Sequence, residues 1–562
     1  MGGRGSRDRL RAAGRAFAAS ARSPAVRRIQ LGFAGASTAE WAFTVVLSVY
    51  AFNQGGAEEV GLVSLVRMLP SAVLAPFASA VADRWRRDLV LTLVSVVRSA
   101  TALAIAFLVA TGGSALAIYA LAVLSTAAAL LYRPVNSALL PLLCHTPTEL
   151  ASANVVRGLL DSVSTLIGPV IAAALLAGDS ASSGFFAVAV ISALSAAVTF
   201  GLTVEEPEAQ GSRGSVVGGL LLGARVSLHS PQMRVLFTLL AAQVITRGGL
   251  SVFSVLVAVD LLGMGEPGVG TLTSAVGAGA VLGSLFASVF VGSRRLAVWF
   301  GGGVALWGAP LIVLAVVPDE PAALGLFALI GVGNALVDVG LFTLVARLVP
   351  ERTLGRVFGL LEAIGGLAVG GGSVLAAWLA SSGGLREALW MIGLLGPALV
   401  LIFWFPLRRL DDAMSARDED LRLLRTVPVF DPLPLPALEQ LASGLRPRQV
   451  SAGEVLYRQG DEADGCVVVE HGSAEVLGDG HQIARVGPGD LVGEIALLRR
   501  VPRTATVRAL TDMDLRLLDA DRFLLVVTGW ESSREVTSEH VDELLDRFSP
   551  ARPASEPRRP PE

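Results

Sequence analysis

Twelve long apolar runs restrict what this chain can fold into. Each comes close to the roughly 20 residues that an α-helix needs to cross a lipid bilayer. Hydrophobic residues make up 53% of the 562-residue sequence and charged residues only 17%, which is too apolar for a soluble protein of this size. We therefore predict a twelve-helix membrane domain over residues 29–410. The runs are Leu31–Phe52, Val60–Ala82, Leu89–Ala110, Ala115–Leu131, Gly158–Leu176, Phe185–Leu202, Val235–Leu262, Gly268–Val291, Leu296–Val317, Ala322–Leu348, Val357–Leu379 and Leu389–Phe405.

The placement of arginine predicts how these helices are oriented. The sequence contains no lysine, so every fixed positive charge is an arginine. Residues 1–28 hold eight arginines and read as a basic cytoplasmic arm, not as a cleaved signal peptide, because the apolar run that follows is long enough to span. The connections between successive runs are alternately rich in arginine and nearly free of it. Because cytoplasmic loops carry the excess of positive charge, we expect a cell-membrane protein with both termini in the cytoplasm.

The two halves of the membrane domain share a pattern of arginine pairs. The pair Arg86-Arg87 follows the second run, and the pair Arg294-Arg295 follows the eighth, which is its equivalent in a six-plus-six repeat. A polar segment, Val204–Ser215, separates the halves. Repeated six-helix bundles are typical of transporters that alternate access around a site near the membrane midplane.

The segment after the second run carries a recognisable motif. Asp83, Arg84, Arg86 and Arg87 resemble the loop motif G-x-x-x-D-R-x-G-R-R of the major facilitator superfamily, although Ser79 replaces its first glycine. The stretch from Tyr132 to Pro141 is similar to a bacterial exporter-like branch of that superfamily. The resemblance implies the major facilitator fold for the twelve-helix domain. It also implies that the loop motif acts as a cytoplasmic gate.

Gly168 and Pro169, in the fifth run, are similar to the antiporter motif of the same superfamily, a glycine-rich helix that ends in G-P-x-x-G-G. Ala172 and Ala173 replace its last glycines. Small residues allow close helix packing, and proline permits a kink. The resemblance favours export over import; the alternative is an ordinary packing kink.

Seven charged residues stand out inside the predicted spans. Charges at this depth are costly, so they usually face a cavity or pair with each other. Glu40 is our candidate for proton coupling or for binding a cationic substrate. We expect the arginines to pair with carboxylates across helices; the alternative is ion pairs that only set helix register. The seven are Glu40, Arg67, Arg98, Asp161, Arg247, Asp338 and Glu362.

The polar C-terminal part of the chain contains a pattern typical of an anion-binding site. Gly493 and Glu494 begin a short apolar helical turn, and a helix start offers unpaired N–H groups to an anion. Nine residues later comes Arg503, whose planar guanidinium matches phosphate geometry. A carboxylate suits such a site only if the ligand also offers hydroxyl groups. The pattern therefore favours a ligand with both a phosphate and a ribose.

This stretch resembles the phosphate-binding cassette of cyclic-nucleotide-binding domains, G-E-x-A-L followed by P-R-x-A-T-V, as in protein kinase A regulatory subunits and cyclic-nucleotide-gated channels. The resemblance implies that Glu494 holds the ribose 2′-OH and that Arg503 holds the cyclic phosphate. Thr504 tilts the expectation toward binding of cGMP as well as cAMP. The alternative is a fold that lost its ligand. The resemblance also implies that the backbone amides of Ile495, Ala496 and Ala505 hold the phosphate, and Gly493 completes the set of cassette residues.

The segments around the cassette fit the same family. Residues 411–420 form a charged linker, and residues 421–548 are expected to form the nucleotide domain. Short strand-like runs separated by glycines predict a jelly-roll-like β-roll. Helices are expected at Leu424–Phe430, Pro436–Leu445, Asp521–Val527 and Arg534–Phe548, and the proline-rich residues 549–562 are expected to be disordered.

Together these patterns predict a secondary transporter, driven by an ion gradient and most simply by protons, that exports small molecules. Cyclic nucleotide, cAMP or cGMP, would be its regulatory ligand. The alternative is a membrane receptor that uses the transporter scaffold to sense a ligand. The sequence lacks a Walker-type phosphate loop, and its five histidines and two cysteines show no metal-binding spacing. We expect no enzymatic activity and no cofactor. We also expect no nucleic-acid partner, because no recognition helix follows the expected helix Arg534–Phe548.

Overall fold

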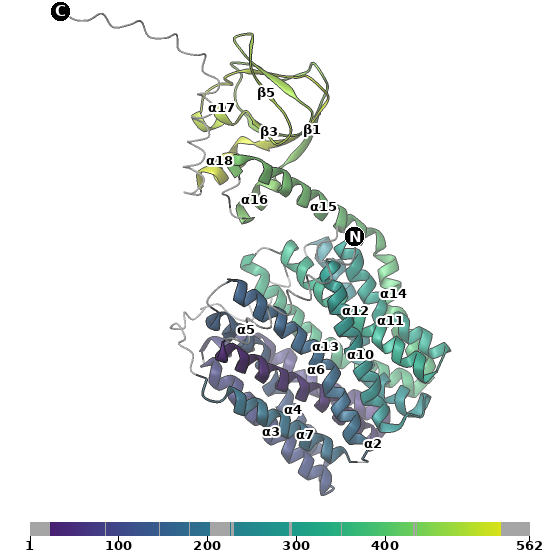
Figure 1. The fold of residues 1–562 in the computed structure, drawn as a ribbon. Helices are drawn as coiled ribbons and strands as arrows, with labels where there is room; N and C mark the ends of the chain where they lie inside the picture. Colours follow the sequence, from purple (N-terminus) through teal and green to yellow (C-terminus); the bar gives the residue numbers. More distant parts are fainter. Residues whose placement is uncertain are drawn as a thin grey trace, which may run out of the picture. The chain divides into compact units, whose positions relative to one another are not determined.

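The computed structural model describes residues 23–84, 86–144, 147–178, 180–202, 225, 230–290, 295–349, 351–430, 433 and 435–529. The chain divides into two compact units after Asp411 (Figure 1). The predicted helix Arg534–Phe548, the predicted tail 549–562 and most of the predicted arm 1–28 lie outside the described residues.

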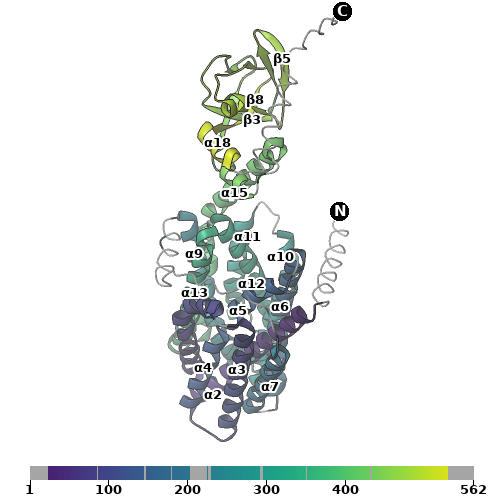
Figure 2. The ribbon, with the colours of Figure 1, turned by 90° about the vertical axis from the view of Figure 1, so that its left-hand side faces the viewer.

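The first unit is helical, and its helices pack side by side (Figures 1 and 2). Within the described residues, ten helices are long and apolar enough to cross a membrane. Each run from the third to the twelfth falls on a helix. The helices are α2 (Pro24–Arg84), α3 (Arg87–Ala110), α4 (Ala115–Ala129), α5 (Tyr132–Leu143), α6 (Pro147–Leu176), α7 (Ala181–Thr199), α9 (Pro231–Leu256), α10 (Gly265–Phe290), α11 (Leu296–Val316), α12 (Glu320–Leu348), α13 (Glu351–Gly383) and α14 (Leu385–Ile402).

Helix α2 contains the first two predicted runs in one 61-residue element, which is not among the ten helices. The helix is interrupted at Gly55 and Gly56, where the backbone leaves helical geometry and Gly56 takes a φ of 67°. Glycine adopts this left-handed conformation without steric cost. The break coincides with the polar connection expected between the first two runs.

Helix α5 differs from the expectation. The fourth predicted run ends at Leu131, which leaves Arg133 in the connection before the fifth run. In the structure the chain continues as α5 from Tyr132, so Arg133 lies within a helix. The seventh run also has a variation, because α9 passes into a short π-helix, η1 (Val257–Leu261).

Small residues let some helix backbones approach closely. A Cβ atom added to Gly279 of α10 would lie 1.8 Å from the backbone oxygen of Ala328, and one added to Gly331 of α12 would lie 1.9 Å from that of Val276. Only glycine fits at both positions. This reciprocal contact holds α10 against α12 in the manner of close-packed membrane helices.

Helix α15 (Trp404–Thr426) contains the boundary between the two units. The predicted linker, residues 411–420, lies within this continuous helix. Asp411 is buried, and its carboxylate accepts hydrogen bonds from the backbone N–H groups of Ala297 (2.7 Å) and Val298 (3.0 Å). A carboxylate at the first turn of α11 satisfies free N–H groups and complements the helix dipole. Asp411 thereby ties α15 to the start of α11.

The second unit contains two four-stranded antiparallel sheets, in the orders β1-β8-β3-β6 and β2-β7-β4-β5. This arrangement confirms the predicted β-roll, and α18 confirms the helix expected at Asp521–Val527. The elements are η2 (Pro428–Phe430), α16 (Leu435–Ala442), β1 (Arg446–Val450), β2 (Val455–Tyr457), β3 (Gly465–His471), β4 (Ala474–Gly478), β5 (His481–Val486), β6 (Leu491–Val492), α17 (Glu494–Arg499), β7 (Thr506–Ala509), β8 (Met513–Asp519) and α18 (Ala520–Gly529).

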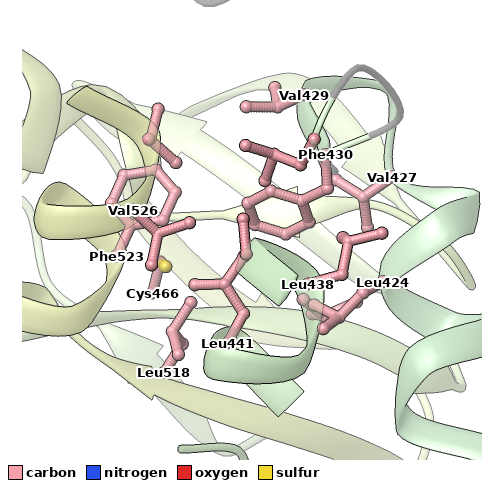
Figure 3. Close-up of a cluster of buried hydrophobic side chains, with 14 of the residues drawn as sticks. Leu424, Val427, Val429, Phe430, Leu438, Leu441, Cys466, Leu518, Phe523 and Val526 are labelled. Atoms are coloured by element: carbon pink, nitrogen blue, oxygen red, sulfur yellow. The ribbon is translucent and has the colours of Figure 1, made fainter. Parts of the chain in front are cut away.

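Two buried clusters form the core of this unit. One lies inside the β-roll. The other joins the end of α15 to η2, α16 and α18, and its rings of Phe430 and Phe523 meet edge to face 6.2 Å apart (Figure 3). Cys466 is buried in this second cluster, as expected of a packing thiol. At the end of α15, Asp420 also pairs with Arg516 at 3.0 Å, so this helix is part of the domain's own fold.

Candidate functional site

The predicted cassette begins at a glycine whose backbone conformation other residues rarely adopt. Gly493 precedes α17 with a φ of 96°, a conformation that favours glycine. A Cβ atom there would lie 2.5 Å from Nη1 of Arg503. Glu494 opens the helix, as expected, and both Glu494 and Arg503 are buried. The two residues singled out in the sequence therefore lie in one site between β6, α17 and the start of β7.

Arg503 is held by the protein's own groups. Its guanidinium donates to the backbone oxygens of Gly493 (3.1 Å) and Gly465 (2.7 Å), and to the carboxylate of Asp464 (3.0 Å). The same guanidinium lies over the ring of Tyr457, 3.7 Å from its centroid. Stacking on an aromatic face and fixed hydrogen bonds together hold the donor fork rigidly.

Part of the Arg503 guanidinium remains without a partner. Its Nε is buried and makes no hydrogen bond to any group in the described part of the chain. A buried donor without a partner is costly and points to a group that would complete the site. A phosphate oxygen has the charge and geometry that such a donor requires. This orphaned atom is the observation that best fits an anionic ligand.

Burial changes the acid–base properties of the site. Desolvation raises the pKa of Glu494 to about 7, against an opposing effect of Arg503. Desolvation also raises the pKa of Tyr457 to about 12, so its hydroxyl stays protonated. A carboxylate poised near neutrality can accept a hydrogen bond from a hydroxyl of a ligand.

The other cassette residues surround this pair. Ala496 is buried in α17, Ile495 and Ala505 are half-buried, and Thr504 is exposed. The exposure of Thr504 leaves its hydroxyl accessible to a ligand. The sequence reading missed Tyr457 and Asp464, which reach Arg503 from β2 and from the residue before β3.

The helical unit encloses a cavity of about 220 Å³. Its lining residues come from α2, α3, α4 and α5 and from α9 through α13. Glu40, Arg67, Arg98 and Arg247, four of the seven predicted membrane charges, line this cavity. Arg133 of α5 lines it as well, although the sequence reading had placed it in a connection.

Two of these arginines are buried without an ion pair. The Nε of Arg67 donates to the hydroxyl of Thr126 at 3.1 Å, and its guanidinium lies 5.1 Å from the ring centroid of Phe43. Arg98 donates to the backbone oxygen of Ala36 at 3.0 Å. Their expected pairing with carboxylates across helices is not formed among the described residues.

The other charged residues follow a different pairing. Asp161 of α6 accepts from Ser37 at 2.8 Å and pairs with Arg133 at 3.0 Å, so its partner is an arginine outside the seven predicted charges. Asp338 of α12 accepts from Asn334 at 2.9 Å. Glu362 is exposed on α13 and does not line the cavity.

The remaining predicted residues lie in helix contacts. A Cβ atom on Gly168 would lie 2.7 Å from the backbone oxygen of Thr38, so this glycine packs α6 against α2. The backbone oxygen of Pro169 similarly faces α10 at Gly270.

In the gate motif, Arg86 pairs with Asp88 at 2.8 Å. Arg87 is the first residue of α3. Asp83 and Arg84 are the last residues of α2, and their side chains lie outside the described part.

Comparison with known families agrees with this architecture. The Major Facilitator Superfamily matches residues 30–317 and 236–445, and the cyclic nucleotide-binding domain family matches residues 447–528. The chain belongs to the Major Facilitator Superfamily and carries a C-terminal cyclic nucleotide-binding domain. With its apolar helices, it is a multi-pass membrane protein.

Individual relatives match only part of the chain. A cyclic nucleotide-gated potassium channel of Rhizobium etli is 34% identical over 176 residues, which cover 31% of this chain and 46% of the channel. The acetyltransferase Pat of Mycolicibacterium smegmatis is 39% identical over 118 residues, 20% of this chain and 31% of that enzyme, all in the nucleotide-binding region. The regulatory domain of Toxoplasma gondii PKA with cAMP is a solved structure similar to 24% of this chain and 52% of its own, at 26% identity and a TM-score of 0.22. The chain spans less than half the length of these two sequence relatives.

Proposed function

We propose that this protein is a secondary transporter whose activity is regulated by cyclic nucleotide bound at Glu494 and Arg503. The buried Nε of Arg503, which has no partner in the described part of the chain, carries the nucleotide half of this proposal. In the bound state Arg503 holds the cyclic phosphate, together with the amides of Ile495, Ala496 and Ala505. Glu494 accepts the ribose 2′-OH. The match of residues 447–528 to the cyclic nucleotide-binding domain family supports the same ligand class.

The transporter itself has twelve spans in two six-helix halves, with both termini and the nucleotide domain in the cytoplasm. Helix α2 supplies the first two spans on either side of Gly55 and Gly56. The alternation of arginine-rich and arginine-free connections supports this orientation. The cavity lined by both halves is the transport site, because both halves must reach a site that opens alternately to the two sides. The proposed transport domain comprises residues 29–410, and the proposed nucleotide-binding domain comprises residues 421–548. Residues 411–420 join them.

Glu40 is the coupling carboxylate in this proposal, and protons are the coupling ion. It lines the cavity, and it interacts electrostatically with Arg67 and Arg98. Export is the proposed direction, with Gly168 and Pro169 in the helix that resembles the antiporter motif. The gate is formed by Asp83, Arg84, Arg86 and Arg87.

Helix α15 is the proposed route of regulation. At one end Asp411 caps α11 of the transporter, and at the other Leu424 lies in the core of the nucleotide domain. A change in that core on nucleotide binding is thereby passed along one helix.

Reconstitution in vesicles tests this function. A panel of small fluorescent organic ions is offered with an imposed pH gradient, with and without cAMP or cGMP on the side of the nucleotide domain. We expect gradient-driven movement of at least one compound, at a rate that changes with nucleotide. Nucleotide binding without movement of any compound would instead identify a receptor built on the transporter scaffold.

A further inference from the structure

Two guanidinium groups that line the cavity form no ion pair with any residue that the structure describes. Arg67 and Arg98 are 6% and 4% exposed, and both line the cavity. Each donates a single hydrogen bond, to Thr126 and to the backbone oxygen of Ala36 respectively, although a guanidinium offers several more donors. In the part of the chain that the structure describes, neither has a carboxylate within ion-pair distance. Buried charges of this kind usually pair or contact a ligand.

The other charges of the cavity do not remove this surplus. Glu40 is the acidic group among the described lining residues, and it interacts with both Arg67 and Arg98. The lining residue Arg133 is already paired with Asp161. Arg247 has Asp338 as its electrostatic neighbour. The positive surplus is therefore concentrated at Arg67 and Arg98, which face one carboxylate between them.

We propose that the cavity binds an amphipathic organic anion, with its carboxylate, sulfonate or phosphate group between Arg67 and Arg98. This substrate class rests on the transport function proposed above and makes it more specific. With Glu40 ionised, a monoanion brings the local set to two positive and two negative charges. A cationic substrate would instead add a third positive charge to the buried pair. The surplus of positive charge thus favours an anionic substrate, whereas Glu40 alone would suggest a cationic one.

Helices α9 to α12 contribute apolar side chains to the same site, in addition to Trp41 and Phe43 of α2. Trp307 of α11 and Phe327 of α12 line the cavity with their buried rings, and Leu250 and Val276 lie beside them in the lining. Aromatic and aliphatic walls with a few convergent polar groups are typical of sites for small amphipathic ligands. Arg67 and Arg98 come from α2 and α3, whereas Trp307 and Phe327 come from α11 and α12, so a ligand that spans the cavity contacts both groups of helices.

Equilibrium dialysis of the full chain in detergent tests the assignment, with empty micelles as the blank. Three probes share one ring system and differ in charge: naphthalenesulfonate, neutral naphthalenesulfonamide and cationic naphthyltrimethylammonium. We expect the sulfonate to bind tightest. Because a hydrogen-bonded charge pair is lost, Arg67→Gln or Arg98→Gln should weaken sulfonate binding by about tenfold or more while the sulfonamide is little affected. Arg67→Lys should retain part of the affinity, and Arg386→Gln, on the exposed start of α14, is the matched control.

The order of the three probes on the wild type decides the question even if a variant fails to fold. Tighter binding of the cation, or equal binding of all three, would overturn the proposal. The same holds if both glutamine variants fold and keep the sulfonate preference. Failure of the transport function is separable: sulfonate that binds but does not cross in vesicles would refute transport and leave the anion site in place.

Discussion

Replacing Arg503 with alanine tests the nucleotide site, and the structure sets the size of the effect. The guanidinium donates to two backbone oxygens, those of Gly493 and Gly465, and to Asp464. Hydrogen bonds from a charged donor contribute about 1.5–3 kcal/mol each. The Asp464 side chain is 88% exposed, so that contact adds little. We expect the free energy of unfolding of the nucleotide domain to fall by about 2–4 kcal/mol, because water partly solvates the carbonyl groups left behind.

Cyclic-nucleotide binding should weaken for a separate reason. The bound phosphate loses a charged partner that no other described residue of the cassette replaces. That loss is worth at least about 1.5–3 kcal/mol, or roughly 10-fold to 150-fold in Kd. Arg503→Lys should recover only part of it, because an ammonium group cannot reproduce the planar fork.

Two measurements on residues 412–562 separate these effects. Urea unfolding gives the change in stability, and calorimetric titration with cAMP, where the variant is fully folded, gives the change in affinity. Arg508→Ala is the matched control, since Arg508 pairs with Glu475 on the neighbouring strand, away from the cassette. If Arg503→Ala binds cAMP as tightly as the wild type, the site assignment is wrong.

Three further predictions concern other residues. The folded-state pKa of Glu494 is about 7 against a usual value of 4.5, so its neutral form stabilises the domain at low pH, and that contribution is lost as pH rises from 4.5 to about 7. In urea unfolding, the wild type should lose up to about 1.4 kcal/mol per pH unit over this window relative to Glu494→Gln, and parallel curves would show that Glu494 does not titrate there. Thr504→Ala should weaken cGMP binding several-fold, by the roughly 0.5–1.5 kcal/mol of one hydrogen bond, while the affinity for cAMP changes less. An equal loss of affinity for both nucleotides in calorimetry would assign Thr504 to the phosphate alone. Glu40→Gln should abolish pH-gradient-driven flux in vesicles, and undiminished coupled flux would remove Glu40 from the coupling role.

Much of the helical unit could be predicted from the sequence, because helices in lipid must be long and apolar. The limits of the runs agree with the observed helices to within a few residues at most positions. Helix α5 was missed because Arg133 and Pro134 interrupt the apolar pattern directly after Leu131. The continuous α15 was missed because its charged residues read as a linker, whereas contacts at both ends stabilise it as one helix.

The sequence predicted more of the nucleotide cassette than of the charged site in the membrane domain. Gly493, Glu494 and Arg503 lie close along the chain, so their spacing alone brought them together. Asp464 lies 39 residues before Arg503 and reaches it only through the β-roll. In the membrane domain the sequence identified the charged positions but not their partners. Partners depend on how each helix is rotated, and many of these helices are apolar on all sides.

Hydrogen exchange of the full chain in detergent, with and without cAMP, tests most directly whether the nucleotide domain acts on the transporter. We predict that cAMP protects the segment from β6 through α17 and also changes exchange in α15 and at the start of α11, where Asp411 caps the helix. In Arg503→Ala neither change should occur. Protection of the cassette with unchanged exchange in α15 and α11 would contradict regulation through this helix.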